Sequence, residues 1–326
     1  MRRILPLGQL GSLAPWAGER TDPEPGGPVP LHEPTSRVLD QLKRARGELE
    51  RMKSAGALLA PAIRAIRRLE IRLERPLRVA VVGEFNSGKS TLTNLLVRIE
   101  SLPTAVVSNT CIPTLVRHAP EPGLWAVHED GRRERLGSAS QAVRQNIRRL
   151  EVGLPSARLR AMQILDLPGL ADARFDGSVA DLAFHEMDVA LWCTFSTQAW
   201  KESERAAWEQ FPERLRSRGL LVATHRDLLH DENDAEKLLR RLRREAGASF
   251  REIVLLSTIK ALAVMHEDHE GPAGAVWKAS GAAAFETALD GLLQNVCMQR
   301  LEAALEVTGR IAGHTLSRID PSSPAA

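Results

Sequence analysis

Apolar residues recur at helical spacing in two segments near the amino end of the chain and in one segment near its carboxyl end. The first segment runs from about residue 36 to residue 59, and the second begins near Pro61, which the first turn of a helix tolerates. The third covers residues 283–319 and would form a helix roughly 50 Å long. We expect the three segments to pack together along their apolar faces. These faces contain Val38, Leu39, Leu42, Ile63, Ile66, Leu69, Leu73, Phe285, Leu289, Leu292, Val296, Leu301 and Leu305.

Short apolar runs bounded by turn residues lie between these helical segments and predict strands. The run 188–195 is apolar almost throughout, as a central strand that is buried on both faces should be. A hairpin is expected where residues 124–128 meet the turn signal at 129–131. Strands alternate with helices, which predicts an α/β domain with a mostly parallel central sheet and helices on both faces. The other expected strands are 77–82, 112–117, 159–165, 220–223 and 252–256, and the expected helices begin at 92 and cover 139–150, 201–210 and 234–244.

The ends of the chain differ in pattern from its centre. Residues 1–34 are rich in proline and glycine and show no hydrophobic period, so we expect a disordered tail there. The helical segments flank the α/β domain on both sides. The expected organisation is the tail 1–34, a helical segment 35–76, the α/β domain 77–265, a second helical segment 273–319 and a tail 320–326.

The composition is that of a soluble globular protein, because hydrophobic residues make up 43% and charged residues 26% of the chain. The formal net charge is only +3, but arginine gathers on the expected helices. Such a helix face is usually just solvated, and the alternative is contact with anionic lipid, nucleic acid or an acidic partner. Tyrosine is absent, which argues against binding of single-stranded nucleic acid by stacking, and we expect neither DNA nor RNA as a partner.

Cys111, Cys193 and Cys297 are too widely separated for a disulfide framework or a zinc site, which favours a reducing cytosol. The apolar residues near the start of the chain are interrupted by Pro6 and Gly8, so no signal peptide is expected. No apolar run approaches the roughly 18 residues of a membrane-spanning helix. We therefore expect a cytoplasmic protein, with any membrane contact peripheral and at the inner face of the cell membrane.

The clearest chemical signal is a glycine-rich loop between the strand 77–82 and the helix that follows. Gly83 and Gly88 let the backbone fold tightly, so that N–H groups and a helix N-terminus converge on an anionic β-phosphate. Lys89 would reach the β- and γ-phosphates, and the Ser90 hydroxyl would bind Mg²⁺. A glycine-rich turn with a capping serine explains neither Lys89 nor the second glycine. The nucleotide-binding residues predicted here are Gly83, Glu84, Phe85, Asn86, Ser87, Gly88, Lys89, Ser90 and Thr91.

Residues 101–111 form a polar connection between the first helix and the second strand of the domain, where a nucleotide switch would lie. We favour Thr110 as the switch residue, because its hydroxyl could complete the Mg²⁺ shell and its N–H could meet the γ-phosphate. Spacing alone fits Thr104 or Ser108 equally well.

Asp166 ends a buried strand and is followed at once by Leu167, Pro168 and Gly169. A carboxylate at this place suits indirect coordination of Mg²⁺ through water, with the Gly169 N–H contacting the γ-phosphate. The short D-x-P-G pattern occurs by chance, but at this distance after a phosphate loop it is much more specific.

Asp227 lies just beyond another predicted strand, after Thr224 and His225. Its carboxylate can accept hydrogen bonds from the ring N–H and the exocyclic amine of guanine, which adenine does not offer in the same geometry. Losing such a charge-assisted pair would cost about 2–4 kcal/mol. The alternative is a strand end followed by a helix cap. Backbone amides at Ser257 and Thr258, after the last strand, are placed to meet the guanine carbonyl oxygen.

The ordered series of motifs resembles that of translation-factor-type GTPases and, more narrowly, that of bacterial dynamin-like GTPases. The narrower likeness rests on Gly-Glu-Phe-Asn-Ser-Gly-Lys-Ser-Thr at 83–91, Leu-Pro-Thr at 102–104, Asp-Leu-Pro-Gly at 166–169 and Thr-Gln-Ala-Trp at 197–200. It covers about residues 78–265. The resemblance implies a P-loop GTPase that needs Mg²⁺, pairs face to face with a second GTPase domain, and has flanking helices that form a neck.

Three positions depart from the family pattern. His225 stands where the family usually has a lysine along the nucleotide plane, and a histidine ring could stack there. Neither Phe85 nor Leu170 offers the glutamine that positions water in related enzymes, so a second GTPase domain could supply the missing groups. In GTPases similar in this loop, an asparagine at the position of Asn86 binds K⁺, whose charge replaces an arginine finger. The resemblance thus makes Lys89, Thr110 and Asn86 the candidate catalytic residues, with Mg²⁺ as cofactor and K⁺ as a hypothesis.

Relatives that remodel membranes insert a long helical stalk and a membrane-contacting tip, whereas about 60 residues follow the domain here. We therefore expect a short dynamin-like GTPase in which GTP-dependent dimerisation, or pairing with a longer dynamin-like partner, moves a short neck at a membrane surface. The alternative is a GTP switch or scaffold that hydrolyses slowly and recruits a partner in ribosome or envelope assembly.

Overall fold

The computed structural model describes residues 33–52, 56–98, 112–138, 147–167, 184–267 and 274–319. Several sequence-based expectations lie outside these ranges. They concern the amino-terminal tail as far as residue 32, the switch candidates Thr104, Ser108 and Thr110, the residues Pro168, Gly169 and Leu170, and the tail 320–326.

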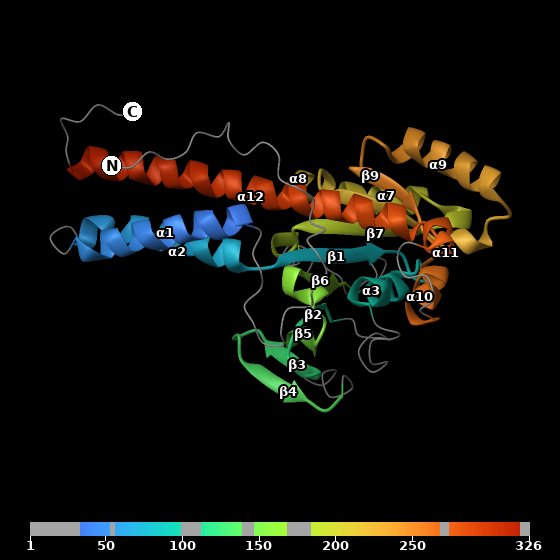
Figure 1. The fold of residues 1–326 in the computed structure, drawn as a ribbon, viewed down its shortest axis with the longest axis horizontal. Coiled ribbons are helices and arrows are strands. Elements are labelled where there is room, and N and C mark those ends of the chain that lie inside the picture. The colour runs from blue at the N-terminus through green and yellow to red at the C-terminus, as the bar shows by residue number, and fades with distance from the viewer. Residues whose placement is uncertain are drawn as a thin grey trace.

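Strands from the whole length of the described α/β region join in one central sheet (Figure 1). They are β1 (Leu77–Gly83), β2 (Thr114–His118), β3 (Gly123–His128), β4 (Arg133–Leu136), β5 (Ile147–Leu154), β6 (Met162–Asp166), β7 (Val189–Phe195), β8 (Gly219–Thr224) and β9 (Glu252–Leu255). Their order across the sheet is β4-β3-β5-β2-β6-β1-β7-β8-β9. The strands β6, β1, β7, β8 and β9 run parallel, so their carboxyl ends meet at one edge. The expected mostly parallel sheet is confirmed. It is extended by β2 and β5, which are parallel to each other and antiparallel to β6, and by the β3–β4 hairpin, in which β3 is antiparallel to β5.

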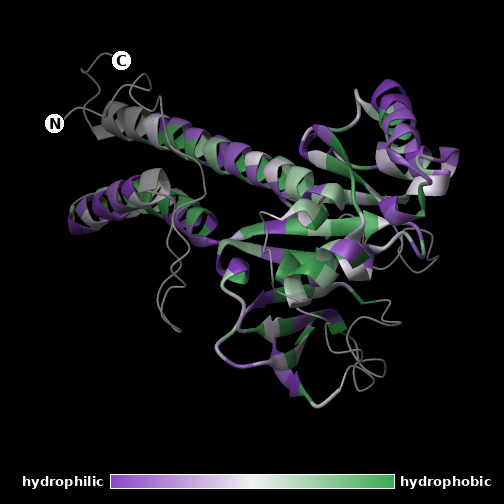
Figure 2. Ribbon diagram, turned by 45° about the vertical axis from the view of Figure 1, so that its right-hand side comes forward, coloured by the Kyte–Doolittle hydropathy of each residue, from purple (hydrophilic) through white to green (hydrophobic). Residues whose placement is uncertain are grey.

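Helices cover both faces of this sheet, as the alternating pattern predicted (Figure 1). One face packs against α3 (Lys89–Val97), α5 (Arg158–Ala161), α10 (Thr258–Glu267), α11 (Ala275–Ala279) and the start of α12 (Ala282–Ile319). The other packs against α7 (Glu202–Glu209), α8 (Glu213–Arg216) and α9 (Glu232–Ala246). Figure 2 shows the hydrophobic centre of the sheet between helices whose outer faces are hydrophilic. Among the described helices, none combines the length and apolar character needed to cross a membrane.

A three-helix bundle extends from the α/β domain, as expected from the apolar spacing (Figure 1). It consists of α1 (Glu33–Arg51), α2 (Gly56–Glu74) and the second half of α12, whose apolar side chains share one cluster. Leu42 of α1, Ile66 of α2 and Leu301 of α12 are all buried there. Because α12 also buries Phe285 and Leu289 against the sheet, one continuous helix links the bundle to the domain.

A buried carboxylate fixes the bundle to the amino-terminal edge of the sheet. Asp188, just before β7, accepts hydrogen bonds from the Arg75 guanidinium at 2.9 Å and from the Arg78 backbone N–H at 2.8 Å. It also pairs with Arg300 of α12, whose guanidinium donates to the Arg75 carbonyl oxygen at 3.1 Å. We call Asp188, Arg75 and Arg300 the Asp188 joint, since it links α2, α12 and β7.

Two expectations about element boundaries were wrong at the helices. The second helix begins at Gly56 rather than near Pro61, so Pro61 lies inside α2, because Leu59 is fully buried and belongs to the same apolar face. The first helix begins at Glu33, two residues before the expected start of the helical segment at residue 35.

The helix expected over residues 139–150 was also wrong in its last part, since residues 147–150 belong to β5. Leu150, Val152 and Leu154 are buried between neighbouring strands. The arginines that suggested a polar helix are instead ion-paired, with Arg149 bound to Glu151 at 2.8 Å and to Glu186 at 3.1 Å. The strand expected to start at Leu159 starts at Met162, because α5 precedes it.

Candidate nucleotide-binding site

The glycine-rich segment forms a tight turn between β1 and α3, as predicted, and we call residues 83–89 the phosphate loop. Gly83 has φ 145°, and a Cβ there would lie 2.3 Å from the carbonyl oxygen of Cys193 in β7. Gly88 has φ 82° and is the N-cap of α3. Both glycines are therefore required by backbone geometry, and the loop places the N-terminus of α3 at the carboxyl edge of the sheet.

Lys89 folds back over the loop that precedes it. Its ammonium donates to the carbonyl oxygens of Gly83 at 3.1 Å and Glu84 at 2.6 Å. Burial lowers the pKa of Lys89, while Cys193, Asp166 and Glu84 act in the opposite direction. A partly desolvated cation beside converging N–H groups is a strong site for an anion such as a phosphate.

Residues 224–227, which we call the base loop, lie next to the phosphate loop. The Thr224 hydroxyl at the end of β8 lies 2.9 Å from the Ser87 carbonyl oxygen, so the two loops are directly linked. Asp227 accepts a hydrogen bond from the Ser257 hydroxyl at 2.5 Å, in the short helical turn Arg226–Leu228. The structure thus brings the predicted phosphate and base residues together at one edge.

One predicted donor has another partner. The backbone N–H of Ser257 donates to the Ser280 carbonyl oxygen at 2.8 Å. Its hydroxyl instead donates to the Asp227 carboxylate. Thr258, the first residue of α10, remains a candidate for the base through its amide.

The predicted Mg²⁺ residues occupy neighbouring elements. Asp166 is the last residue of β6, beside β1, and Ser90 is exposed in the first turn of α3. Burial raises the pKa of Asp166 to about 6, and Lys89 lowers it. A hydroxyl and a carboxylate are the oxygen donors that Mg²⁺ prefers, so these residues fit the ion.

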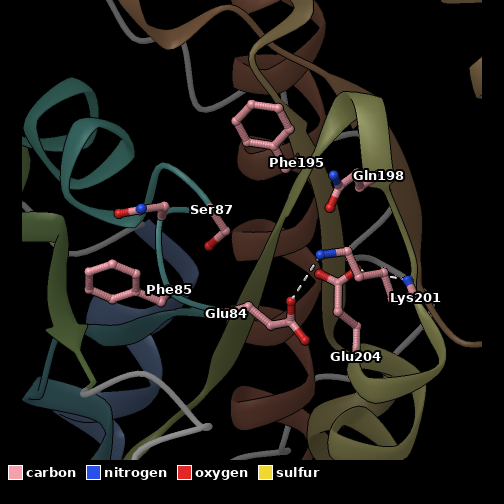
Figure 3. Close-up of a pocket in the computed structure, with 8 residues that line it drawn as sticks. Glu84, Phe85, Ser87, Phe195, Gln198, Lys201 and Glu204 are labelled. Carbon is pink, nitrogen blue, oxygen red and sulfur yellow. Dashed lines mark hydrogen bonds and ion pairs between the residues drawn. The ribbon is translucent and has the colours of Figure 1, made fainter.

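A cavity of about 240 Å³ lies between the phosphate loop and the residues at the end of β7 and after it (Figure 3). Sequence reasoning missed this wall of the site, which comes from the residues that follow β7. Glu84 accepts a hydrogen bond from Ser203 at 2.5 Å and faces the Lys201 ammonium at 3.6 Å, which attaches the loop to α7. A signal was present, since loops at the carboxyl end of a central parallel strand line ligand sites. The cavity is lined by Glu84, Phe85, Asn86, Ser87, Phe195, Gln198, Lys201 and Glu204.

Glu204, which lines this cavity, is a buried acceptor that orders the loop after β7. Its carboxylate accepts from the Thr194 hydroxyl at 2.8 Å, from the Lys201 backbone N–H at 2.9 Å and from the Trp192 indole at 3.2 Å. Phe85, by contrast, is 81% exposed at the tip of the phosphate loop.

Comparison with known proteins gives consistent similarities. The dynamin family profile matches residues 79–225. Dynamin-like protein 2 of Campylobacter jejuni is 30% identical over 175 residues, which cover 51% of this chain and 29% of that protein. Isoniazid-induced protein IniC of Mycobacterium tuberculosis is 38% identical over 120 residues, covering 34% of this chain and 24% of that protein.

A solved structure supports the same fold. It shows an oligomerised bacterial dynamin pair, described as a mechanism for the long-range sensing and tethering of membranes, with 16% identity and a TM-score of 0.58. The match covers 88% of this chain and 55% of that one. The matched segments span less than a third of the two curated relatives. The family to which this chain is similar through residues 79–225 is therefore the dynamin family.

Proposed function

We propose that this protein binds GTP and hydrolyses it to GDP and phosphate at the carboxyl edge of its parallel strands. The observation that carries the proposal is the direct hydrogen bond between the two loops, from the Thr224 hydroxyl to the Ser87 carbonyl oxygen at 2.9 Å. A phosphate loop alone would accept many nucleotides. Joined to a carboxylate at Asp227, it favours a nucleotide with a guanine base.

Each residue has a proposed role. Lys89 and the loop N–H groups bind and orient the phosphates, and Asp227 reads the base. Ser90, Asp166 through water, and Thr110 would hold Mg²⁺, which supplies charge neutralisation for the transferring phosphoryl group. Gly169 is proposed to contact the γ-phosphate. The other proposed nucleotide contacts are Gly83, Glu84, Phe85, Asn86, Ser87, Gly88, Thr91, Thr224, His225, Ser257 and Thr258.

The three-helix bundle is proposed to be the moving part. β7 begins at the Asp188 joint and ends at Phe195, beside the phosphate loop. A rearrangement at the nucleotide edge could therefore reach α2 and α12 through a single strand. This proposal includes the domain limits. The neck comprises residues 35–76 and 273–319, and the GTPase domain comprises residues 77–265.

Selectivity among nucleotides tests the proposal most sharply. Titration of wild type with GTP, ATP and XTP should show a preference for GTP. Asp227→Asn should weaken GTP binding by about 2–4 kcal/mol and improve XTP relative to GTP, because XTP replaces the amine with a carbonyl. The control Asp234→Asn changes an exposed carboxylate in α9 and should bind as wild type does. Unchanged GTP affinity in Asp227→Asn contradicts the base assignment.

A slow GTP switch or scaffold is a second candidate function, favoured by Phe85 and Leu170 in the place of a water-positioning glutamine. Turnover that rises more than linearly with protein concentration would support an enzyme activated by dimerisation. Flat, near-zero turnover with tight GTP binding would support the switch. The exposed Asn86, at φ 59°, carries the K⁺ hypothesis, and equal turnover in K⁺ and Na⁺ buffers would contradict it.

Partners and location follow from the relatives only as proposals. We expect a nucleotide-dependent homodimer or a pair with a longer dynamin-like protein, in the cytoplasm and peripheral at the membrane. Flotation with liposomes of anionic lipid, with and without GTP, checks the membrane contact. Binding that is equal for neutral and anionic liposomes would argue against contact through the arginine-rich helices.

A further inference from the structure

His225 is fixed by contacts on three sides, although its backbone has a left-handed φ of 56°. Its Nδ1 lies 2.8 Å from the Thr224 hydroxyl oxygen. Its ring lies on Phe195, with 4.2 Å between centroids and 31° between planes. Its Cε1 faces Gly88 so closely that a Cβ there would be 3.3 Å away. The imidazole therefore occupies the junction of the base loop, the phosphate loop and the end of β7.

The hydrogen bonds of Thr224 determine which ring nitrogen carries the proton. The hydroxyl oxygen lies 2.9 Å from the Ser87 carbonyl oxygen and 3.1 Å from the Thr194 carbonyl oxygen. Both carbonyls can only accept, so they take the single hydroxyl proton. Nδ1 of the neighbouring imidazole must then donate its own proton to the hydroxyl oxygen. The neutral ring is thus the Nδ1–H tautomer, and its Nε2 keeps a lone pair.

We propose that His225, as this tautomer, is a positioning residue that locks the base loop to the phosphate loop. The inference rests on the proposed function, in which both loops bind the same GTP. The connection runs from the imidazole through the Thr224 hydroxyl to the Ser87 carbonyl oxygen. Phe195 supports it from β7, and Figure 3 shows Phe195 and Ser87 on the wall of the same cavity.

The direction of the hydrogen bond has a consequence for pH. If Nδ1 accepted a proton from Thr224, protonation of the ring would break the bond. Because Nδ1 donates in both the neutral and the charged ring, acidification adds a proton to Nε2 and leaves the link intact. The two loops should therefore stay joined whether the ring is neutral or charged.

Nitrogen-15 NMR of histidine-labelled protein without nucleotide reads the tautomer directly, since protonated and unprotonated ring nitrogens have distinct chemical shifts. We expect His225 at pH 8 to show a protonated Nδ1 and an unprotonated Nε2, and Nδ1 to stay protonated at lower pH. The signals are assigned by their loss in His225→Asn. An Nε2–H tautomer at pH 8 would overturn the proposal. This measurement needs no GTP, so it separates failure of this inference from failure of the proposed function.

Two substitutions test the role by GTP affinity. The amide nitrogen of Asn can occupy the position of Nδ1, whereas that of Gln corresponds to Nε2. His225→Gln should bind GTP about fivefold to tenfold more weakly than His225→Asn, a difference equal to the value of one hydrogen bond. Equal losses for both, at unchanged unfolding midpoints, would overturn the proposal.

Thr224→Val tests the other end of the link. It should turn His225 into the Nε2–H tautomer and weaken GTP binding by about fivefold to tenfold. The matched control Thr287→Val removes a hydroxyl that bonds the Ala283 carbonyl oxygen on the exposed side of α12, and should change neither quantity. A His225 that stays Nδ1–H in a folded Thr224→Val protein would show that another group fixes the ring.

Discussion

Asp166 and Asp188 are carboxylates beside the two strands that flank β1, at opposite edges of the sheet, and their surroundings differ sharply. Asp188 lies among Arg75, Arg300 and a backbone N–H, all in direct contact. Burial raises the pKa of Asp166 to about 6, and the charge of Lys89 acts in the opposite direction. The first carboxylate is satisfied by the protein itself. Among the residues that the structure describes, no cation forms an ion pair with the second, as is found where a ligand completes the surroundings of a group.

The same contrast extends to the cations. Burial lowers the pKa of Arg75 to about 10, but the Asp188 carboxylate keeps it paired. Burial also lowers the pKa of Lys89, whose close partners are two neutral carbonyl oxygens. We infer that removing one charge at the amino edge would leave its partners desolvated and unpaired, whereas the charges at the carboxyl edge already cost stability without a bound ligand.

The largest expected effect is at the amino edge. Asp188→Ala should lower the free energy of unfolding by about 3–5 kcal/mol, because it leaves the buried Arg300 and the half-buried Arg75 without their carboxylate. Urea denaturation measures this effect. The control Glu302→Gln changes an exposed carboxylate on the same helix as Arg300 and should stay within about 0.5 kcal/mol. A loss below about 1 kcal/mol would remove the contrast between the two edges.

Substitution of Lys89 should act on binding rather than on stability. Lys89→Met should weaken GTP, ATP and XTP binding by at least about 100-fold, because charge-assisted contacts to two phosphates are lost. The unfolding free energy without nucleotide should stay level or rise, since the folded state disfavours this cation. The control is Lys237→Met, at an exposed lysine of α9. Normal nucleotide binding by Lys89→Met would refute the assignment of Lys89 to the phosphates. Weak binding caused by unfolding of the variant would refute the contrast between the two edges of the sheet.

The smallest effect should come from Asp166. Because its folded pKa of about 6 lies above the ordinary 3.8, the wild type loses stability as pH rises from about 4 to 6 and not beyond. Asp166→Asn lacks this loss, so without nucleotide it should match wild type near pH 4 and exceed it by about 1–2 kcal/mol at pH 7. That figure is below the full shift because the side chain retains contact with water. Urea unfolding at pH 4, 5, 6 and 7 gives the profile, and parallel profiles for both proteins would contradict it.

The parts of the molecule that follow a local pattern were predictable. The phosphate loop is predicted by Gly83, Gly88 and Lys89, because backbone geometry and charge require those residue types at that spacing. The apolar run 188–195 predicts a central strand, because both faces of such a strand are buried. The bundle was predictable in kind, since helical spacing requires a partner for each apolar face.

The parts that depend on distant partners were not predictable. β5 resembled a polar helix because its arginines are paired with Glu186, which lies far along the chain. The Asp188 joint unites residues 75, 188 and 300, and no short motif records such a contact. The cavity wall and the anchor from Ser203 to Glu84 were missed for the same reason. Base selectivity and the Mg²⁺ residues stay predictions, since the sequence gives their order and chemistry but not their ligand.

Cys193 lies directly behind the phosphate loop, where its carbonyl oxygen excludes any side chain at Gly83. Its thiol is fully buried, and burial raises its pKa to about 12. Only the thiolate reacts rapidly with alkylating reagents, so labelling of Cys193 requires the core packed around it to open locally. Cys193, which has no proposed part in the chemistry, can therefore report on local opening of the protein. Its alkylation rate, followed by mass spectrometry, would time the opening of the sheet centre and show how far a bound nucleotide slows it.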